Sequence, residues 1–117
     1  MSDAPTMISS RPINITIAEK KELYKCYMPF VQGGALYIPL ADFDFQIGQK
    51  VFIILTLPNE KTKKTISGKI IWINKTTQNK GFGVTLGEGT QAKALKDLIE
   101  TIIVDTPNKN ELVTYTI

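Results

Sequence analysis

Short stretches of alternating hydrophobic and polar residues recur along the chain, which is the pattern of strands with one buried face. In residues 11–17, Ile13, Ile15 and Ile17 alternate with polar residues and predict the first strand. Four more strands are expected between glycine, proline or polar turns, and they cover residues 34–40, 51–57, 65–73 and 81–86. Together these stretches predict a curled antiparallel sheet or a small barrel.

Glycines interrupt two of the predicted strands. Gly68 is expected to mark a bulge or a bend of the kind that lets a sheet curl. The alternating glycines in residues 81–86 could leave room for a close neighbour, or bend at a barrel corner. Trp72 lies in the middle of a predicted strand, and if it faces the barrel interior, its replacement by alanine should unfold the domain.

Two other stretches have the spacing of helices. A short helix is predicted after Thr16, which offers an N-cap with Glu19 at capping-box spacing, and it must end before Pro29. A longer helix is predicted over residues 90–104, with Thr90 as its cap. One face of it gathers the hydrophobic residues Leu95, Leu98, Ile99, Ile102 and Ile103. The fold class is therefore mainly β, with an amphipathic helix packed on the sheet.

The length of 117 residues suits one domain with one core. An apolar content of 43% and a charged content of 21% are those of an ordinary globular protein. Residues 1–10 are expected to form a flexible arm, residues 11–106 the folded domain and residues 107–117 a C-terminal tail. The polar N-terminus lacks the features of a signal peptide, and no apolar run has membrane-spanning length, so a cytoplasmic protein is expected.

The net charge is +3, and Arg11 is the only arginine among the fourteen basic residues. The lysines cluster at residues 20–21, 61–64 and 75–80, which lie in different predicted turns. Scattered lysines are typical of a solvated surface, whereas specific phosphate or base recognition favours arginine. A small basic barrel that binds single-stranded nucleic acid stays open as an alternative function.

The residue types limit the chemistry that this chain can perform. It has no histidine and one cysteine, Cys26, so zinc sites, histidine-based triads and disulfides within the chain are excluded. Cys26 lies in an apolar context that favours a packed thiol over a nucleophile. Asp42 and Asp44 alone make a poor metal site, and residues 87–93 lack the order of a Walker A loop. We therefore expect no enzymatic activity, no metal and no cofactor.

The stretch from Cys26 to Ala41 carries no charge. It holds several large apolar and aromatic side chains around Gly33 and Gly34, together with Pro29 and Pro39. These glycines and prolines are poor strand formers, so one long buried strand is excluded. The run could be core, a ligand-binding loop or a surface for another protein.

Several segments resemble the core strands of the PilZ domain family. They read IGQKVFIILTLPNE, ISGKIIWINK and KGFGVTL. The stretch LYKCYMPFVQGGALYIP is similar to the branch of that family that works in type IV pilus assembly. The resemblance covers about Ile13 to Val104. It implies a six-stranded antiparallel barrel with a short N-terminal helical segment and a C-terminal amphipathic helix.

PilZ domains that bind cyclic di-GMP carry an Arg-x-x-x-Arg arm, whose guanidinium planes pair with phosphates and stack on guanine. Arg11 is the only candidate here. If Arg11 is the second arginine of the motif, Met7 replaces the first. If it is the first, Ile15 replaces the second. In either alignment the arm lacks one of its two guanidinium groups.

The second cyclic di-GMP motif of the family is Asp/Asn-x-Ser-x-x-Gly. If Gly34 is its glycine, Pro29 replaces the acid or amide and Val31 replaces the serine. Only the glycine remains, so the resemblance implies a domain that does not bind cyclic di-GMP. A cyclic di-GMP receptor with a degenerate site stays open as an alternative.

The resemblance implies a non-enzymatic adaptor in type IV pilus biogenesis and twitching motility. Such proteins contact the pilus assembly ATPase and an EAL-domain regulator that takes part in cyclic di-GMP signalling. The charge-free run then becomes a partner-binding segment, because exposed aromatic residues near a proline make binding hot spots. The predicted anchor residues are Tyr24, Tyr27, Met28, Pro29 and Phe30.

Overall fold

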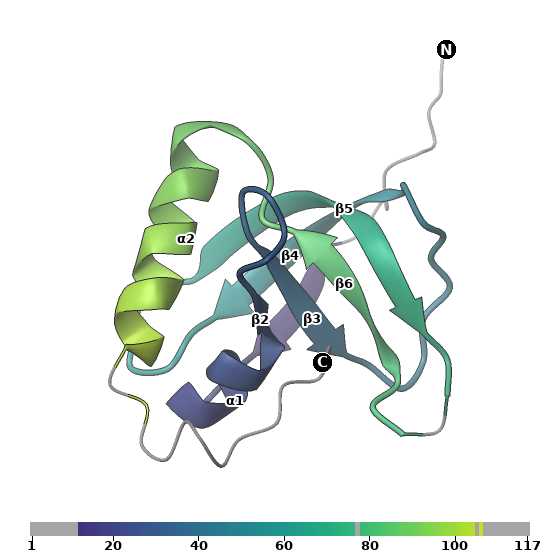
Figure 1. Cartoon of the computed structure of the whole chain (residues 1–117), viewed down its shortest axis with the longest axis horizontal. Coiled ribbons are helices and arrows are strands. Elements are labelled where there is room, and N and C mark those ends of the chain that lie inside the picture. Colours follow the sequence, from purple (N-terminus) through teal and green to yellow (C-terminus); the bar gives the residue numbers. More distant parts are fainter. Residues whose placement is uncertain (1–11, 77, 105, 107–117) are drawn as a thin grey trace.

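Six strands form one curled sheet, and two helices pack beside it, within the part of the chain that the structure describes (Figure 1). The computed structural model describes residues 12–76, 78–104 and 106. The predicted flexible arm, residues 1–10, and the predicted tail, residues 107–117, lie outside the described residues, as does Arg11.

The elements follow the sequence pattern closely. The strands are β1 (Ile13–Thr16), β2 (Tyr27–Met28), β3 (Ala35–Pro39), β4 (Lys50–Thr56), β5 (Lys64–Asn74) and β6 (Gly81–Thr85). The helices are α1 (Lys20–Cys26) and α2 (Gly89–Ile103). All five strands expected from the alternation are present, and β2 is a two-residue strand that the pattern did not predict.

The spatial order of the strands is β1-β4-β5-β6-β3-β2. Strand β1 pairs with β4 in parallel, whereas the other neighbours in the sheet are antiparallel. The expectation of a fully antiparallel barrel is therefore wrong in this detail. The two end strands of the order, β1 and β2, do not pair with each other, so the described sheet is a curled half-barrel with mixed pairing.

The predicted capping box at Thr16 does not form. Thr16 is the last residue of β1, where it pairs with Thr56, and the amide of Ile17 continues the pairing with a 2.8 Å bond to the Thr56 carbonyl. Glu19 takes the N-cap position of α1 instead. Pairing with β4 satisfies the backbone of Thr16, so its local capping preference does not decide the structure.

Helix α2 has the predicted apolar face. Leu95, Ile99, Ile102 and Ile103 are buried, and Leu98 is half-buried against the same core. The helix begins one residue earlier than expected, with Glu88 rather than Thr90 at the N-cap position. This face closes the main core over the inner surface of the sheet.

Trp72 does not face the interior. Its side chain is 42% exposed, so the premise that its replacement would empty a core site is wrong. The cause is a register shift in β5, where Ile70 pairs with Val84 and Trp72 with Gly83. The shift lies between Ile70 and Trp72 rather than at Gly68, and it interrupts the two-residue alternation of inward and outward side chains.

Candidate functional site

The predicted anchor residues divide into buried and accessible groups. Tyr27 is 4% exposed and Met28 is fully buried, so neither offers a surface to a partner in this structure. Tyr24, on α1, is half-buried and packs against the main core. Pro29 and Phe30 are exposed in the turn after β2, Phe30 at 66%. The accessible part of the predicted anchor is thus Pro29, Phe30 and one side of Tyr24.

Tyr27 links the first helix to the second. Its hydroxyl donates a 2.6 Å hydrogen bond to Glu100 Oε2, and Lys96 Nζ lies 2.9 Å from the same oxygen. Burial and the bond to Glu100 raise the pKa of Tyr27 above its usual range. The hydrogen bonds from Tyr27 and Lys96 lower the pKa of Glu100. Tyr27 therefore acts as a structural contact between the α1–β2 junction and α2.

Met28 belongs to a small second core on the outer face of the sheet. This outer cluster consists of Met28, Ala35 and Tyr37, with Val31 packed against it. A β-carbon placed on Gly83 would lie 2.8 Å from Met28 Cε and 2.9 Å from Trp72 Cβ. Met28 and Trp72 therefore lie close together over Gly83. This confirms the expectation that the glycines of β6 leave room for neighbouring side chains.

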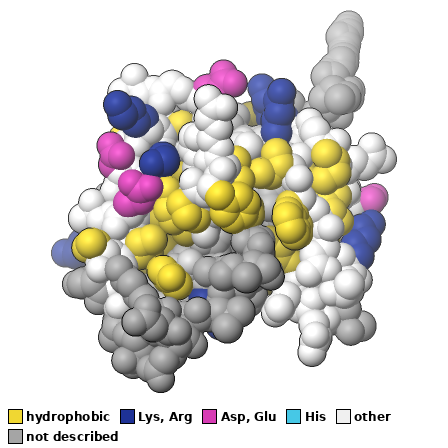
Figure 2. Space-filling model, in the orientation of Figure 1, with side chains coloured by type: hydrophobic (Ala, Val, Ile, Leu, Met, Phe, Trp, Pro, Cys, Tyr) yellow, Lys and Arg dark blue, Asp and Glu magenta, His cyan; other side chains and the backbone are white. Residues whose placement is uncertain are grey.

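An exposed apolar surface borders the outer cluster. We define it by Phe30, Ile71 and Trp72, which are 66%, 38% and 42% exposed. Figure 2 shows hydrophobic side chains gathered in a band across the face that carries β2, β3 and β6 in Figure 1. Three large apolar groups in this position form a candidate contact site for another protein.

Sequence reasoning did not assign Trp72 to this surface. The alternation in β5 gives no warning of the register shift that turns both Ile71 and Trp72 outward. The available signal was Gly83, because a glycine inside a strand often marks the close approach of a neighbouring group. Reading Gly83 together with Trp72 on the paired strand would have found the contact.

The residues that correspond to the second cyclic di-GMP motif, Asp/Asn-x-Ser-x-x-Gly, lie in the turn between β2 and β3. Pro29 is exposed, Val31 packs on the outer cluster, and Gly34 is buried. Gly33 and Gly34 have φ values of +79° and +84°, which favour glycine. Backbone geometry thus explains the one motif residue that the chain retains, without any reference to a ligand.

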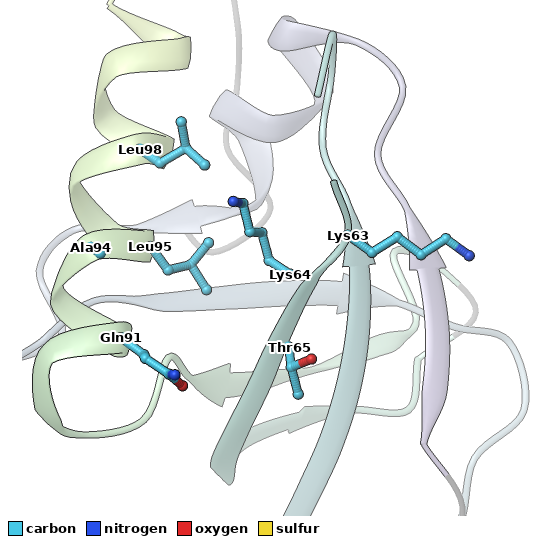
Figure 3. Close-up of a pocket in the computed structure, with 7 residues that line it drawn as sticks. All are labelled: Lys63, Lys64, Thr65, Gln91, Ala94, Leu95 and Leu98. Carbon is cyan, nitrogen blue, oxygen red and sulfur yellow. The ribbon is translucent and has the colours of Figure 1, made fainter. Parts of the chain in front are cut away.

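A small pocket of about 320 Å³ lies between α2 and the start of β5. Figure 3 shows Leu95 and Leu98 on the helix side and Lys64 extending toward them, while Lys63 points away. The remaining residues of its lining are Thr65, Gln91 and Ala94. The described residues of this lining include no carboxylate and no activated nucleophile, so they offer no arrangement for acid–base or nucleophilic chemistry.

The thiol of Cys26 is buried in the main core. Burial, with a smaller contribution from Glu22, raises its pKa to about 12, so the nucleophilic thiolate is disfavoured at neutral pH. Among the described residues, no group of three acidic or cysteine side chains could hold a metal ion. Neither described helix is long and apolar enough to cross a membrane.

Two comparisons with known proteins complete the description. A family model described as PilZ domain matches residues 9–103 of the chain. The match spans all six described strands and both described helices. A search of curated proteins found no match.

Proposed function

The chain belongs to the PilZ domain family, and on that premise we propose that it is a cytoplasmic adaptor of type IV pilus biogenesis. PilZ domains are in general non-enzymatic binding or adaptor domains connected with cyclic di-GMP. The observation that carries the proposal is the exposed apolar surface of Phe30, Ile71 and Trp72 on the outer face of the sheet. The domain works by docking this surface onto a protein partner, with no chemistry of its own.

The proposed partners are the pilus assembly ATPase and an EAL-domain regulator of cyclic di-GMP signalling. They follow from the similarity of residues 23–39 to the pilus-assembly branch of the family. The proposed anchor is Phe30 with Pro29 and the accessible side of Tyr24, extended by Trp72. Met28 packs beside Trp72 and supports this surface from within the outer cluster. Tyr27 belongs to the main core, where it holds α2, and takes no part in the surface.

We propose further that the domain does not bind cyclic di-GMP itself. Pro29 and Val31 stand where the ligand-binding motif has groups that hydrogen-bond, and neither side chain can do so. Lysine does not replace a stacked guanidinium, because its ammonium is a point charge without a planar face. The alternative, a receptor with a degenerate site, requires binding without these groups.

Binding assays with purified partners test the adaptor proposal. Phe30→Ala and Trp72→Ala should each weaken binding to the ATPase or to the regulator by about 2 kcal/mol or more, which is roughly thirtyfold. Val104→Ala is the matched control, since Val104 is a 67% exposed apolar residue at the end of α2. If all three variants bind as the wild type does, the proposed surface is not the docking site.

Isothermal titration with cyclic di-GMP tests the second part of the proposal. We expect no heat of binding at ligand concentrations well above the micromolar range. A dissociation constant of about 1 μM, or −8 kcal/mol, would instead support the receptor alternative.

A further inference from the structure

A second surface lies beside the proposed docking surface and has a different character. A groove of about 1060 Å³ runs between the start of α2, the middle of β5 and the turn before β3. These three segments converge at the same end of the molecule (Figure 1). Among the described residues, the charged side chains that line the groove are four lysines, Lys50, Lys69, Lys93 and Lys96, and one carboxylate, Glu88.

Two of these lysines face each other across a strand pair. Lys50 of β4 and Lys69 of β5 are register partners, and both are exposed. Like charges directly opposite each other on a sheet destabilise it. Within the described residues, Lys50, Lys69 and Lys93 have no ion-pair partner. An anion bound in the groove would relieve this repulsion.

Backbone and lysine stems form the walls of the groove. At Gly68 a β-carbon would lie 1.9 Å from the Thr85 carbonyl oxygen, so no side chain fits there. Lys96 crosses from α2 toward the turn before β3, and its Cγ and Cδ would lie 3.4 Å from a β-carbon on Gly34. Its ammonium is paired with Glu100, which leaves Lys50, Lys69 and Lys93 as the available charges.

We propose that this groove binds an acidic peptide segment of a protein partner. Among the described residues, the lining contains no aromatic side chain on which a base could stack and no arginine, so they offer a nucleotide or single-stranded nucleic acid none of its usual contacts. Carboxylates of an extended peptide need only point charges along an open channel. The inference rests on the proposed function, since it assumes that the domain works through protein contacts.

The position of the groove supports the same assignment. Gln32 and Gly33 line the groove, and they belong to the turn that also carries Phe30. A single partner could therefore place an apolar group on Phe30 and Trp72 and an adjoining acidic segment in the groove. This arrangement gives the partner a testable composition, namely an apolar anchor followed by glutamates or aspartates.

Fluorescence anisotropy with a labelled hexaglutamate peptide tests the inference. We expect binding to the full chain at ~50 mM salt that weakens as salt screens the charges, and no binding of hexaglutamine. Lys69→Glu and Lys93→Glu, on two different elements, should each reduce the affinity by about tenfold or more. Lys75→Glu makes the same charge change at an exposed position outside the groove and should reduce it far less.

Lys69→Glu has a second signature that separates this site from a random basic patch. It replaces a like-charge pair with an opposite-charge pair, so the melting temperature of the free domain should rise by about 2 °C or more while peptide binding falls.

Equal loss of binding in Lys75→Glu, or displacement of the peptide by cyclic di-GMP, would overturn the inference. If hexaglutamate does not bind but Phe30→Ala still weakens partner binding, the groove assignment fails and the proposed function stands. If the peptide binds while neither proposed partner does, the proposed function fails instead.

Discussion

The two faces of the β3–β6 pair are built differently. On the inner face, Leu36 and Ile38 of β3 and Phe82 and Val84 of β6 join the main core, which the two helices cover. On the outer face, β3 contributes Ala35 and Tyr37 to a much smaller cluster, and on β6 Gly83 leaves space for Met28 and Trp72. Successive side chains of a strand point to opposite faces of the sheet, so the residues of the inner set and those of the outer set alternate along each strand.

The inner face contributes mainly to the stability of the fold, and the border of the outer face is the part available for binding. The chain itself closes the inner face, where all four side chains are fully buried. The outer cluster is bordered by Trp72 and Phe30, which are partly exposed to solvent. Substitutions on the inner face should therefore change mainly the free energy of unfolding, and those at the outer border should change mainly binding.

Phe82→Ala should have the largest effect on stability. The Phe82 ring makes edge contacts with Phe43 and Phe45 at centroid distances of 5.3 and 5.2 Å, and its removal leaves a cavity in the main core. We expect a loss of about 3–5 kcal/mol in the free energy of unfolding, measured by urea denaturation. Trp72→Ala is the comparison from the outer border and should cost only about 1 kcal/mol. Equal losses would show that the two faces do not differ in this way.

Gly83→Ala tests the packing of the outer face. The new β-carbon would lie under 3 Å from both Met28 Cε and Trp72 Cβ. The methionine end can move, but the tryptophan Cβ is fixed to the strand, so we expect a loss of about 1–3 kcal/mol. Because Trp72 is the only tryptophan, its fluorescence should also shift.

Gly48→Ala is the control for this experiment. Gly48 has a φ of +90° and meets no atom within 4 Å, so alanine there adds backbone strain without contact. It should lower stability and leave the Trp72 emission unchanged. An unchanged spectrum in Gly83→Ala would contradict the described contact.

Alkaline titration compares one buried ionisable group from each face. Burial raises the pKa of Cys26 in the main core and of Tyr37 in the outer cluster. A group with a raised pKa stabilises the folded state below its unfolded pKa and loses that contribution as the pH rises toward the folded value. Stability should therefore fall above about pH 9 for the thiol, by about 1.4 kcal/mol per pH unit until the pH nears its folded pKa of about 12. For the phenol it should fall above about pH 10.

Two variants separate the contributions to this pH dependence. Cys26→Ala should remove the decline that begins near pH 9. Tyr37→Phe should reduce the decline that begins near pH 10, to which Tyr27, whose pKa is also raised, contributes as well. Thermal melts at several pH values give the measurement. A wild-type slope retained in both variants would mean that neither group is kept neutral by burial.

Tyr27→Phe should have the smallest effect. Tyr27 belongs to the inner cluster and the next residue, Met28, to the outer one, so this position marks the boundary between the faces. Loss of its hydrogen bond to Glu100 should cost about 1 kcal/mol, because Glu100 is partly solvated. Tyr24→Phe is the matched control and should be nearly neutral. The contact would have no energetic role if both variants unfold at the same urea concentration.

The strands and the apolar face of α2 could be predicted because their side chains repeat with the period of the structure. Two features escaped for the same physical reason, namely that pairing with a distant strand decided them. Thr16 extends β1 instead of capping α1, and the register shift beside Ile71 turns Trp72 outward. Which residues of the charge-free run are buried also depends on distant contacts. Tyr27 is hydrogen-bonded to Glu100, and Met28 packs on Gly83 at the outer side of β6. Local pattern carries no information on such partners.

The parallel pairing of β1 with β4 has a consequence for the order of folding. Ile13 pairs with Ile53, and α1, β2 and β3 lie between these two strands in the sequence. The pairing of β1 with β4 therefore closes a long loop. The hairpin of β4 and β5, in contrast, closes between near neighbours such as Leu55 and Lys64. Because distant contacts cost more loop entropy, β1 should dock after the folding transition state. Substitutions in β1, such as Ile15→Val, should then speed unfolding and leave the folding rate almost unchanged.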